Sequence, residues 1–226
     1  MKTNQWLWLL LVPVIAGMGG CIVHDQITTL TINPDGSGDL IILRSNIRST
    51  EKGSRAETEI AEYHASFDAQ TQDDFKRIRE SGARLEMAMW VRKQVPMAHS
   101  IRASIPNAAA LEKLASFRDA RGTIVVTPKF TISDIHRRLA FHVTVSSEQI
   151  PTPSSNADRF ANFKRTQASG ISDFRVAVYG GKIMDARGFN IASDGQSALL
   201  DVDEISSLLR ASNGDIEIFV QWEVSD

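Results

Sequence analysis

The chain contains a single cysteine, Cys21, and this residue constrains the fold more than any other feature of the sequence. It follows a short polar head with one positive charge, Lys2, and an apolar run of eleven residues at positions 6–16. That run is too short to cross a hydrocarbon core of about 30 Å, and the arrangement is typical of an export signal. Because an exported chain with one cysteine cannot form an internal disulfide, a hydrophobic core must hold the fold together.

The residues directly before Cys21 are Gly17, Met18, Gly19 and Gly20. They resemble the lipobox of bacterial lipoproteins, a hydrophobic residue and two small residues before an invariant cysteine, with Met18 where leucine is more usual. The resemblance implies cleavage between Gly20 and Cys21, attachment of diacylglycerol to the Cys21 thiol, and acylation of the freed amine. Two or more chains give stable anchoring where one gives marginal binding.

We therefore predict a lipoprotein signal peptide at residues 1–20 and a single lipid-anchored domain at residues 21–226. An ordinary secretory signal with Cys21 free and an uncleaved N-terminal helix are the alternatives, which the position of the only cysteine disfavours. Residue 22 is isoleucine rather than aspartate, and by resemblance to Gram-negative sorting rules this favours the outer membrane. The expected location is the cell envelope, on the periplasmic face of the outer membrane in a Gram-negative host, with the anchor only at the N-terminus.

Alternating apolar and polar residues predict a β-rich domain with several helices. The expected strands form a hairpin at 26–46 and continue at 84–91, 97–105, 123–133, 138–147, 174–178, 182–186, 198–202 and 215–224. Helices are expected at 51–82, as two short helices or one bent one with a capping box at 71–74, and after Asn107, Asn156 and Asp203. Gly180-Gly181 is interpreted as a hairpin turn. The predicted class is α+β: an antiparallel β-sheet with three to five helices packed on one face or at its ends.

Charge and motifs exclude several functions. Removing the signal takes away Lys2, one of 25 basic residues, and leaves 24 basic against 27 acidic residues. A slightly acidic domain is a poor candidate for nucleic-acid binding, which requires a cationic surface. The sequence contains no Gly-x-Ser-x-Gly, His-Glu-x-x-His or phosphate-loop motif. We expect no catalytic residues, although carboxylates brought together by the fold remain an open alternative.

The five histidines do not form a metal-binding pattern. His136 and His142 lie on or near one predicted hairpin at an even offset, but no acidic residue or cysteine stands at ligand spacing beside them. His24 is interpreted as part of the linker beside the anchor, and His64 and His99 have no obvious partners. We therefore expect no metal and no cofactor.

A basic run follows the first predicted strand pair: Arg44, Arg48, Lys52 and Arg55. Because the first strand begins a few residues after the anchor, this run could contact anionic lipid headgroups, and an ordinary solvated face is the alternative. The acidic residues Asp73, Asp74, Asp201, Asp203 and Glu204 are expected at helix N-termini, where the dipole favours them. The aromatic residues Phe160, Phe163, Phe174, Phe189 and Trp222 are expected in the core.

Two stretches carry a family resemblance. In the first, Cys21 is followed by a strand, the turn sequence of residues 35–38 and a second strand; the other covers residues 174–186 and 193–201. Together they resemble the LppM-type bacterial lipoproteins and related lipoproteins of unassigned function. This chain lacks the C-terminal membrane helix of the mycobacterial members, and it has leucines at 199–200 where an aromatic is expected. The resemblance implies an α+β domain proposed to bind lipid-like ligands, and it supplies no catalytic residue.

These observations predict a non-enzymatic, lipid-anchored envelope protein. It would contact the membrane through lipidated Cys21 and bind an amphiphilic ligand or a partner protein in a groove between sheet and helices. One alternative is a structural or assembly lipoprotein whose partner is another envelope protein. The other is an envelope hydrolase with an unrecognised site, which a deep pocket with convergent polar groups would favour.

Overall fold

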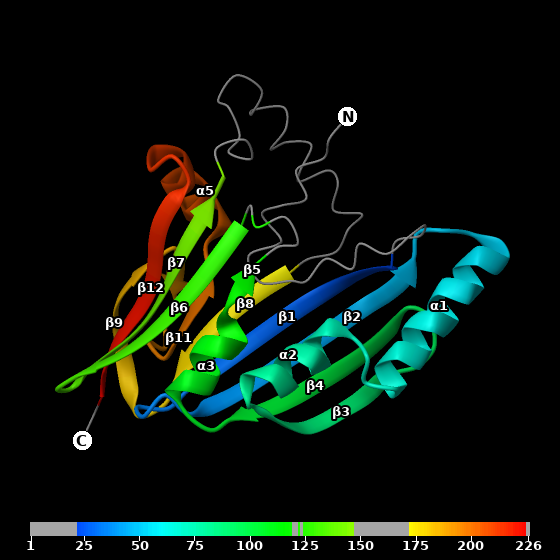
Figure 1. The fold of residues 1–226 in the computed structure, drawn as a ribbon, viewed down its shortest axis with the longest axis horizontal. Helices are drawn as coiled ribbons and strands as arrows, with labels where there is room; N and C mark the ends of the chain where they lie inside the picture. Colours follow the sequence, from blue (N-terminus) through cyan, green and yellow to red (C-terminus); the bar gives the residue numbers. More distant parts are fainter. Residues whose placement is uncertain (1–21, 119–121, 123, 147–171, 225–226) are drawn as a thin grey trace.

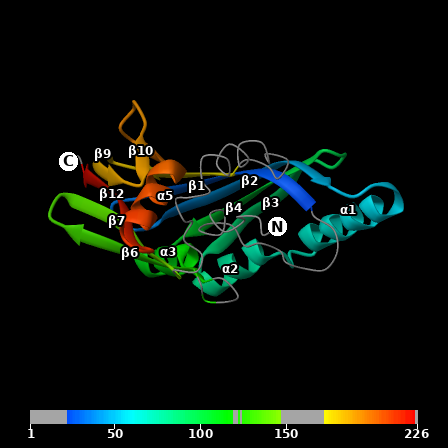
Figure 2. The same cartoon turned by 90° about the horizontal axis from the view of Figure 1, so that it is seen from above.

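A computed structural model describes residues 22–118, 122, 124–146 and 172–224 (Figure 1). Its strands form a seven-stranded sheet, here called the large sheet, in the order β10-β11-β8-β1-β2-β4-β3. A five-stranded small sheet has the order β5-β6-β7-β12-β9. The small sheet packs beside one end of the large sheet, and α1 and α2 cover the other end (Figures 1 and 2).

The strands of the large sheet are β1 (Ile22–Ile32), β2 (Gly38–Ser49), β3 (Arg84–Arg92), β4 (Met97–Ile105), β8 (Ser172–Val178), β10 (Phe189–Ile191) and β11 (Ser197–Leu200). Those of the small sheet are β5 (Phe117–Arg118), β6 (Ile124–Ser133), β7 (His136–Val145), β9 (Gly181–Arg187) and β12 (Asp215–Val224). The described helices are α1 (Gly53–Asp68), α2 (Asp73–Ser81), α3 (Ala108–Ala115) and α5 (Val202–Ala211).

The predicted fold class is wrong. The chain is mainly β, with two sheets rather than one antiparallel sheet carrying helices, and β1 pairs with β8 in parallel. The predicted hairpin at Gly180-Gly181 does not form, because β8 belongs to the large sheet and β9 to the small one. Gly180 has a φ of +61°, and a Cβ on Gly181 would lie 2.3 Å from the carbonyl oxygen of Glu223. These glycines therefore let the chain pass tightly from one sheet to the other.

Several local predictions are confirmed. β1 and β2 form the expected hairpin, with antiparallel pairs running from Ile22–Ser49 to Ile32–Gly38. Residues 51–82 form two helices, and Gly82 ends α2 with a left-handed φ of 84°. The side chain of Asn107 caps α3 by accepting a hydrogen bond from the amide of Ala110. Local turn and cap chemistry was thus readable from the sequence.

Other local predictions are corrected. Gln72, not Thr71, is the N-cap of α2, and its side chain makes no capping bond. α5 is capped by Asp201, whose carboxylate accepts from the amides of Asp203 and Glu204, so Asp203 lies inside the helix. The helix predicted after Asn156 lies outside the described residues.

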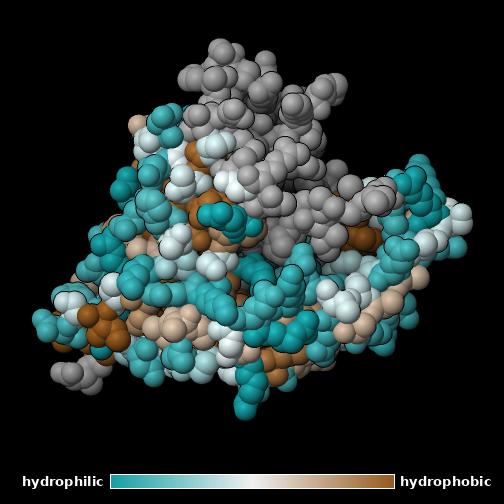
Figure 3. All heavy atoms as spheres, in the orientation of Figure 1, coloured by the Kyte–Doolittle hydropathy of each residue, from teal (hydrophilic) through white to brown (hydrophobic). Residues whose placement is uncertain are grey.

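The main core joins both sheets and the helices above them, and a second, smaller cluster of Ile47, Tyr63 and Met97 packs between the large sheet and α1. Phe174, Phe189 and Trp222 are buried in it as predicted, while Phe160 and Phe163 lie outside the described residues. The surface over α1 and α2 is mainly hydrophilic or intermediate, so these helices turn their apolar sides to the large sheet (Figure 3). No helix in the described part of the chain is long and apolar enough to cross a membrane.

Candidate functional site

The inner face of the large sheet changes chemistry along its strands. On β1, Leu30 and Ile32 point inward and are buried in the core. Gln26 and Thr28 precede them on the same face of the strand and are also buried, but they are polar. β2 repeats the change, since Arg44 follows the buried Leu40 and Ile42 on the same face. The polar end lies under α1 and α2 (Figure 1).

Arg44 is the centre of this polar end. Its guanidinium lies 2.7 Å from the Asp74 carboxylate of α2, and the two side chains are 4% and 5% exposed. Its Nε donates to Oε1 of Gln26 at 2.7 Å, and Nε2 of Gln26 donates to the hydroxyl of Thr28 at 3.0 Å. Burial alone would lower the pKa of Arg44, but the Asp74 carboxylate raises it above its ordinary value. Arg44 therefore stays charged inside the protein.

A second polar contact lies beside this pair. Nε2 of His99 on β4 is 2.9 Å from the hydroxyl of Tyr63 on α1, and the ring of Phe67 lies 4.1 Å from the imidazole, centroid to centroid. His99 is fully buried. Burial, with the charge of Arg44, lowers the pKa of His99 to about 3. Burial raises the pKa of Tyr63, so both side chains are neutral at physiological pH.

His24 completes the polar end. It lies within β1, partly buried and close to Arg44 and Asp74, rather than in a linker, which corrects the sequence interpretation. Burial and the neighbouring Arg44 lower the pKa of His24 to about 4. Among the described residues, Nδ1 of His24, Nδ1 of His99 and Oε1 of Gln72 are buried without a hydrogen-bond partner. Such atoms are costly in a core and common where a ligand binds.

A cavity of about 50 Å³ separates the large sheet from α2 and α3. Its polar end is formed by Gln26 and Thr28 of the sheet and by Asp74 and Arg77 of α2. The rest of its wall is apolar and comprises Leu30, Leu40, Ile42, Ile78, Leu111, Leu114, Ala115 and Phe174. The cavity is therefore amphipathic, with charge at one end only.

Arg77 is the cation at the mouth of the polar end. Its guanidinium donates to the carbonyl oxygens of Leu114 at 2.7 Å and Ser116 at 3.4 Å, which ties α2 to the end of α3. Burial lowers the pKa of Arg77, although Asp74 and Asp73 oppose the shift. Arg44, Asp74 and Arg77 together carry one net positive charge, and because Asp74 is already paired with Arg44, Arg77 is the charge left to meet a ligand at this end.

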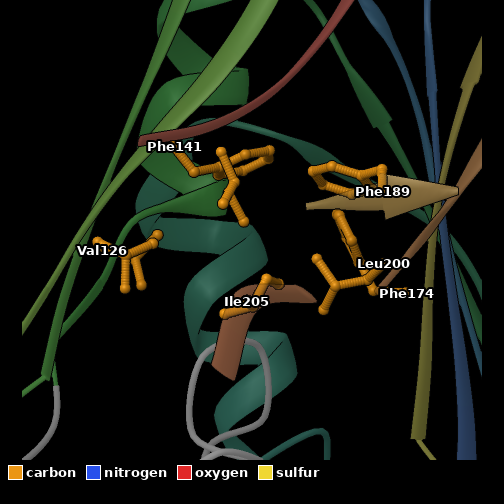
Figure 4. Close-up of a pocket in the computed structure, with 8 residues that line it drawn as sticks. Val126, Phe141, Phe174, Phe189, Leu200 and Ile205 are labelled. Atoms are coloured by element: carbon orange, nitrogen blue, oxygen red, sulfur yellow. The ribbon is translucent and has the colours of Figure 1, made fainter. Parts of the chain in front are cut away.

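A second cavity lies between the two sheets and α5 (Figure 4). Phe141 and Val126 of the small sheet face Phe189 and Leu200 of the large sheet, and Ile205 of α5 closes it from below in this view. Its wall is wholly apolar and its volume about 10 Å³, too small for an ordered water molecule. We interpret it as a packing gap rather than a site.

The structure separates the four basic residues predicted to contact headgroups. Arg44 is buried against Asp74, so it is not available to lipid, and its inclusion is corrected. Arg48, Lys52 and Arg55 are exposed around the end of β2 and the start of α1, with Arg55 3.9 Å from Glu59. Cys21 and Gly20 lie outside the described residues.

The other histidines have structural partners. His136 and His142 are both exposed on β7, and His142 lies 3.2 Å from Asp215 of the neighbouring β12. His64 stacks on Trp90 with ring centroids 4.3 Å apart and lies 3.2 Å from Asp68. No group of three or more potential metal ligands occurs among the described residues.

Sequence reasoning missed most of the polar end. It treated His99 as isolated and Asp74 only as a helix N-terminal acid, a role that the structure confirms without excluding its ion pair. One signal was present in the sequence: Gln26 and Thr28 share the parity of Leu30. Polar residues on the buried parity of a strand indicate a buried polar cluster.

No family model matches the chain, and the search of curated proteins found no match. Among solved structures, the chain is similar to the folded domain of the LppM protein of Mycobacterium tuberculosis, determined by NMR. The two are 12% identical with a TM-score of 0.42, and the comparison covers 95% of this chain and 97% of that one. LppM is also the family that the turn sequences resemble. At this level the likeness does not establish a shared function.

Proposed function

We propose that this chain is a lipid-anchored, non-enzymatic protein of the bacterial cell envelope that binds the polar end of an anionic amphiphile. The binding site is the cavity between the large sheet, α2 and α3. The observation that carries the proposal is the division of this cavity into a polar end, with Asp74 and Arg77, and an apolar wall. A few convergent polar groups in an otherwise apolar cavity are the usual composition of a small-molecule site.

The charges of the polar end favour an anionic headgroup. Arg44 neutralises Asp74 at 2.7 Å, so Arg77 supplies the net charge that a phosphate or carboxylate would meet. The orphaned Nδ1 of His24 and Oε1 of Gln72 belong to neighbouring residues of β1 and α2 that do not line the cavity.

The volume of the cavity limits the size of the ligand that can enter while α2 and α3 stay in place. About 50 Å³ is well below the range of about 300–1,000 Å³ typical of ligand pockets. A long acyl chain therefore requires α2 and α3 to move away from the sheet. Phe174 lines both this cavity and the apolar gap between the two sheets and α5, so its rotation would join the two.

The envelope location and the anchor are part of the same proposal. β1 begins at Ile22, directly after the predicted lipid-bearing Cys21, so a lipidated chain would hold the domain close to the membrane. Residues 1–20 would be removed as the signal. Outer-membrane placement, on the periplasmic face, applies if the host is Gram-negative.

Two alternatives are less favoured. For a hydrolase, the paired Tyr63 and His99 are the nearest approach to a catalytic arrangement, but His99 is fully buried and Tyr63 nearly so. For an assembly lipoprotein, the partner would be an envelope protein. Turnover of an ester substrate that is abolished by His99→Gln would support the hydrolase, and a cross-linked envelope protein without any bound amphiphile would support the assembly role.

Native mass spectrometry of residues 22–226, purified without denaturation, tests the proposal. We expect a reproducible amphiphile adduct, and we expect added decyl phosphate to bind more tightly than decyl alcohol. Ala115→Leu fills the cavity from α3 and should weaken decyl phosphate binding, whereas Ala61→Leu on the exposed side of α1 should not. A bare protein mass with equal, non-saturating uptake of both compounds would contradict the proposal.

A further inference from the structure

The turn between β3 and β4 is unusually exposed and apolar for a loop. Residues 91–96 are all exposed. Val91 is 61% and Val95 52% exposed, and Met89 on the preceding strand is 47% exposed. Exposed apolar side chains gathered at one tip indicate a contact surface rather than chance.

Along the sequence the charge around this tip has one sign, although in the fold Asp68 of α1 lies close to Lys93. Residues 87–104 contain Arg92, Lys93 and Arg102 and no acidic residue. Arg102 lies farther along β4 and pairs with Asp39 at 3.4 Å, whereas Arg92 and Lys93 are in the tip itself. Aliphatic side chains flanked by cations match the chemistry of an anionic lipid surface, with an apolar interior beneath phosphates.

The tip lies at the end of the large sheet where the chain continues toward Cys21. Ile22, the first residue of β1, pairs with Ser49 at the end of β2. Two residues earlier on β2, Ile47 pairs with Met97, which is the first residue of β4 and directly follows the tip. From β1 the order runs through β2 and β4 to β3, three strand steps or roughly 14 Å at the usual spacing. Figures 1 and 2 show the start of β1 and the β3–β4 turn at this same end.

Other surfaces of this end are less selective. Arg48, Lys52 and Arg55 also lie here, but Glu51, Glu57 and Glu59 stand among them, so that region is mixed in charge. The β3–β4 tip combines exposed aliphatic side chains with two cations, Arg92 and Lys93, and has a single acidic neighbour, Asp68, close to Lys93. It is therefore the part of this end best suited to enter a lipid surface.

We infer that the β3–β4 turn is a second membrane contact: Val91 and Val95 enter the headgroup region of the anchoring membrane while Arg92 and Lys93 contact lipid phosphates. This inference rests on the anchor at Cys21 in the proposed function. One lipid anchor leaves the domain free to rotate, and a second contact fixes the large sheet relative to the membrane. The polar end of the cavity then faces the same membrane from which an amphiphile would come.

A site-specific fluorophore tests the contact in the full chain. Because a lipidated Cys21 has no free thiol, Val95→Cys provides the only reactive one, and an environment-sensitive NBD label can be attached there. Tyr179→Cys is the matched control, since Tyr179 is 59% exposed and its amide donates to Ile32, at the opposite end of β1. The labelled chains are reconstituted in vesicles of phosphatidylcholine and phosphatidylglycerol with nitroxide-labelled lipid.

We expect the chains to float with the vesicles, and the label at 95, but not at 179, to shift to the blue and be quenched by nitroxide lipid. Arg92→Gln with Lys93→Gln should reduce the fraction in contact about 30-fold, from about fivefold per cation. Flotation with an unquenched label at 95 overturns the contact and leaves the anchor standing. A blue shift without nitroxide quenching indicates a protein partner and also overturns it. Chains that do not float and have an unmodified Cys21 overturn the anchor and the contact with it.

Discussion

Two halves of one sheet face show opposite chemistry. Where the small sheet and α3 cover the large sheet, the buried residues are apolar, as at Leu30 and Val176. Where α1 and α2 cover it, the same strands also bury polar and charged residues, as at Gln26 and Arg44, beside a small apolar cluster that includes Met97. Burial is equal in the two halves, so it does not explain the difference. The apolar half accounts for folding, and the polar half carries a cost that folding alone does not require.

The largest expected effect comes from breaking the buried ion pair. Arg44→Met leaves the Asp74 carboxylate buried without its partner at 2.7 Å, and we expect a loss of about 3–5 kcal/mol in the free energy of unfolding. Urea unfolding measures it. The double variant Arg44→Met with Asp74→Leu should recover most of this loss. If the double variant is as unstable as the single one, the polar half is needed for folding and the comparison fails.

The apolar half should respond differently to the same kind of test. Leu30→Ala removes a side chain that is 2% exposed and should cost about 2–5 kcal/mol, because a cavity remains in the core. Leu30→Met, which conserves volume, should cost less than about 1.5 kcal/mol. Urea midpoints of the two variants give the comparison. Equal losses in both would mean that shape, not apolar volume, determines stability there.

Acid should destabilise the polar half selectively. The pKa of His99 is lowered to about 3 and that of His24 to about 4, while the same residues in the unfolded chain titrate near about 6.5. The unfolded state therefore binds more protons below that pH, and stability that is complete above pH 6.5 is lost as the pH falls. The expected loss is roughly 1 kcal/mol per pH unit for each histidine.

His99→Gln removes one of the two titrations while it keeps a hydrogen-bonding side chain for Tyr63. The slope of stability against pH between 6.5 and 4 should become shallower than in the wild type. A slope that does not change in His99→Gln would show that this imidazole is protonated in the fold.

The smallest effects come from exchanging single groups between the halves. Thr28→Val removes the hydroxyl that accepts from Gln26 at 3.0 Å, and it should cost about 1 kcal/mol. Val176→Thr places a hydroxyl without a partner in the apolar half, where Val176 is fully buried, and should cost about 1–3 kcal/mol. Urea unfolding of the two variants shows which one loses more free energy of unfolding. If Thr28→Val costs more, the polar half contributes to stability after all.

The sequence predicted local structure better than the assembly of the sheets. Turn residues around Gly36, the cap at Asn107 and the alternation of β6, β7 and β12 act within a few residues, so the sequence shows them directly. Which sheet a strand joins depends on long-range pairing, which alternation does not specify. The sequence therefore predicts a hairpin at Gly180-Gly181, whereas in the structure the chain passes there from one sheet to the other.

The candidate site was even less visible. Arg44 and Asp74 are 30 positions apart by number, and Tyr63 and His99 are 36 apart, so no spacing rule brings them together. The basic run looks continuous in the sequence, but a β-bulge between Arg44 and Ile47 reverses the alternation of β2, so that Arg44 faces inward and Arg48 outward. The only indication in the sequence was that Gln26 and Thr28 occupy positions of β1 that alternate in step with the buried Leu30. They did not show which helix would cover them.

The central claim is that the polar half binds an anionic headgroup through Arg77. Isothermal titration of decyl phosphate and decyl alcohol into Arg77→Met, with Arg79→Met as the matched control on the exposed side of α2, tests it most directly. We predict that Arg77→Met lowers decyl phosphate affinity at least about tenfold and leaves decyl alcohol affinity unchanged, whereas Arg79→Met leaves both affinities unchanged. Equal decyl phosphate affinity in the two variants would contradict the claim.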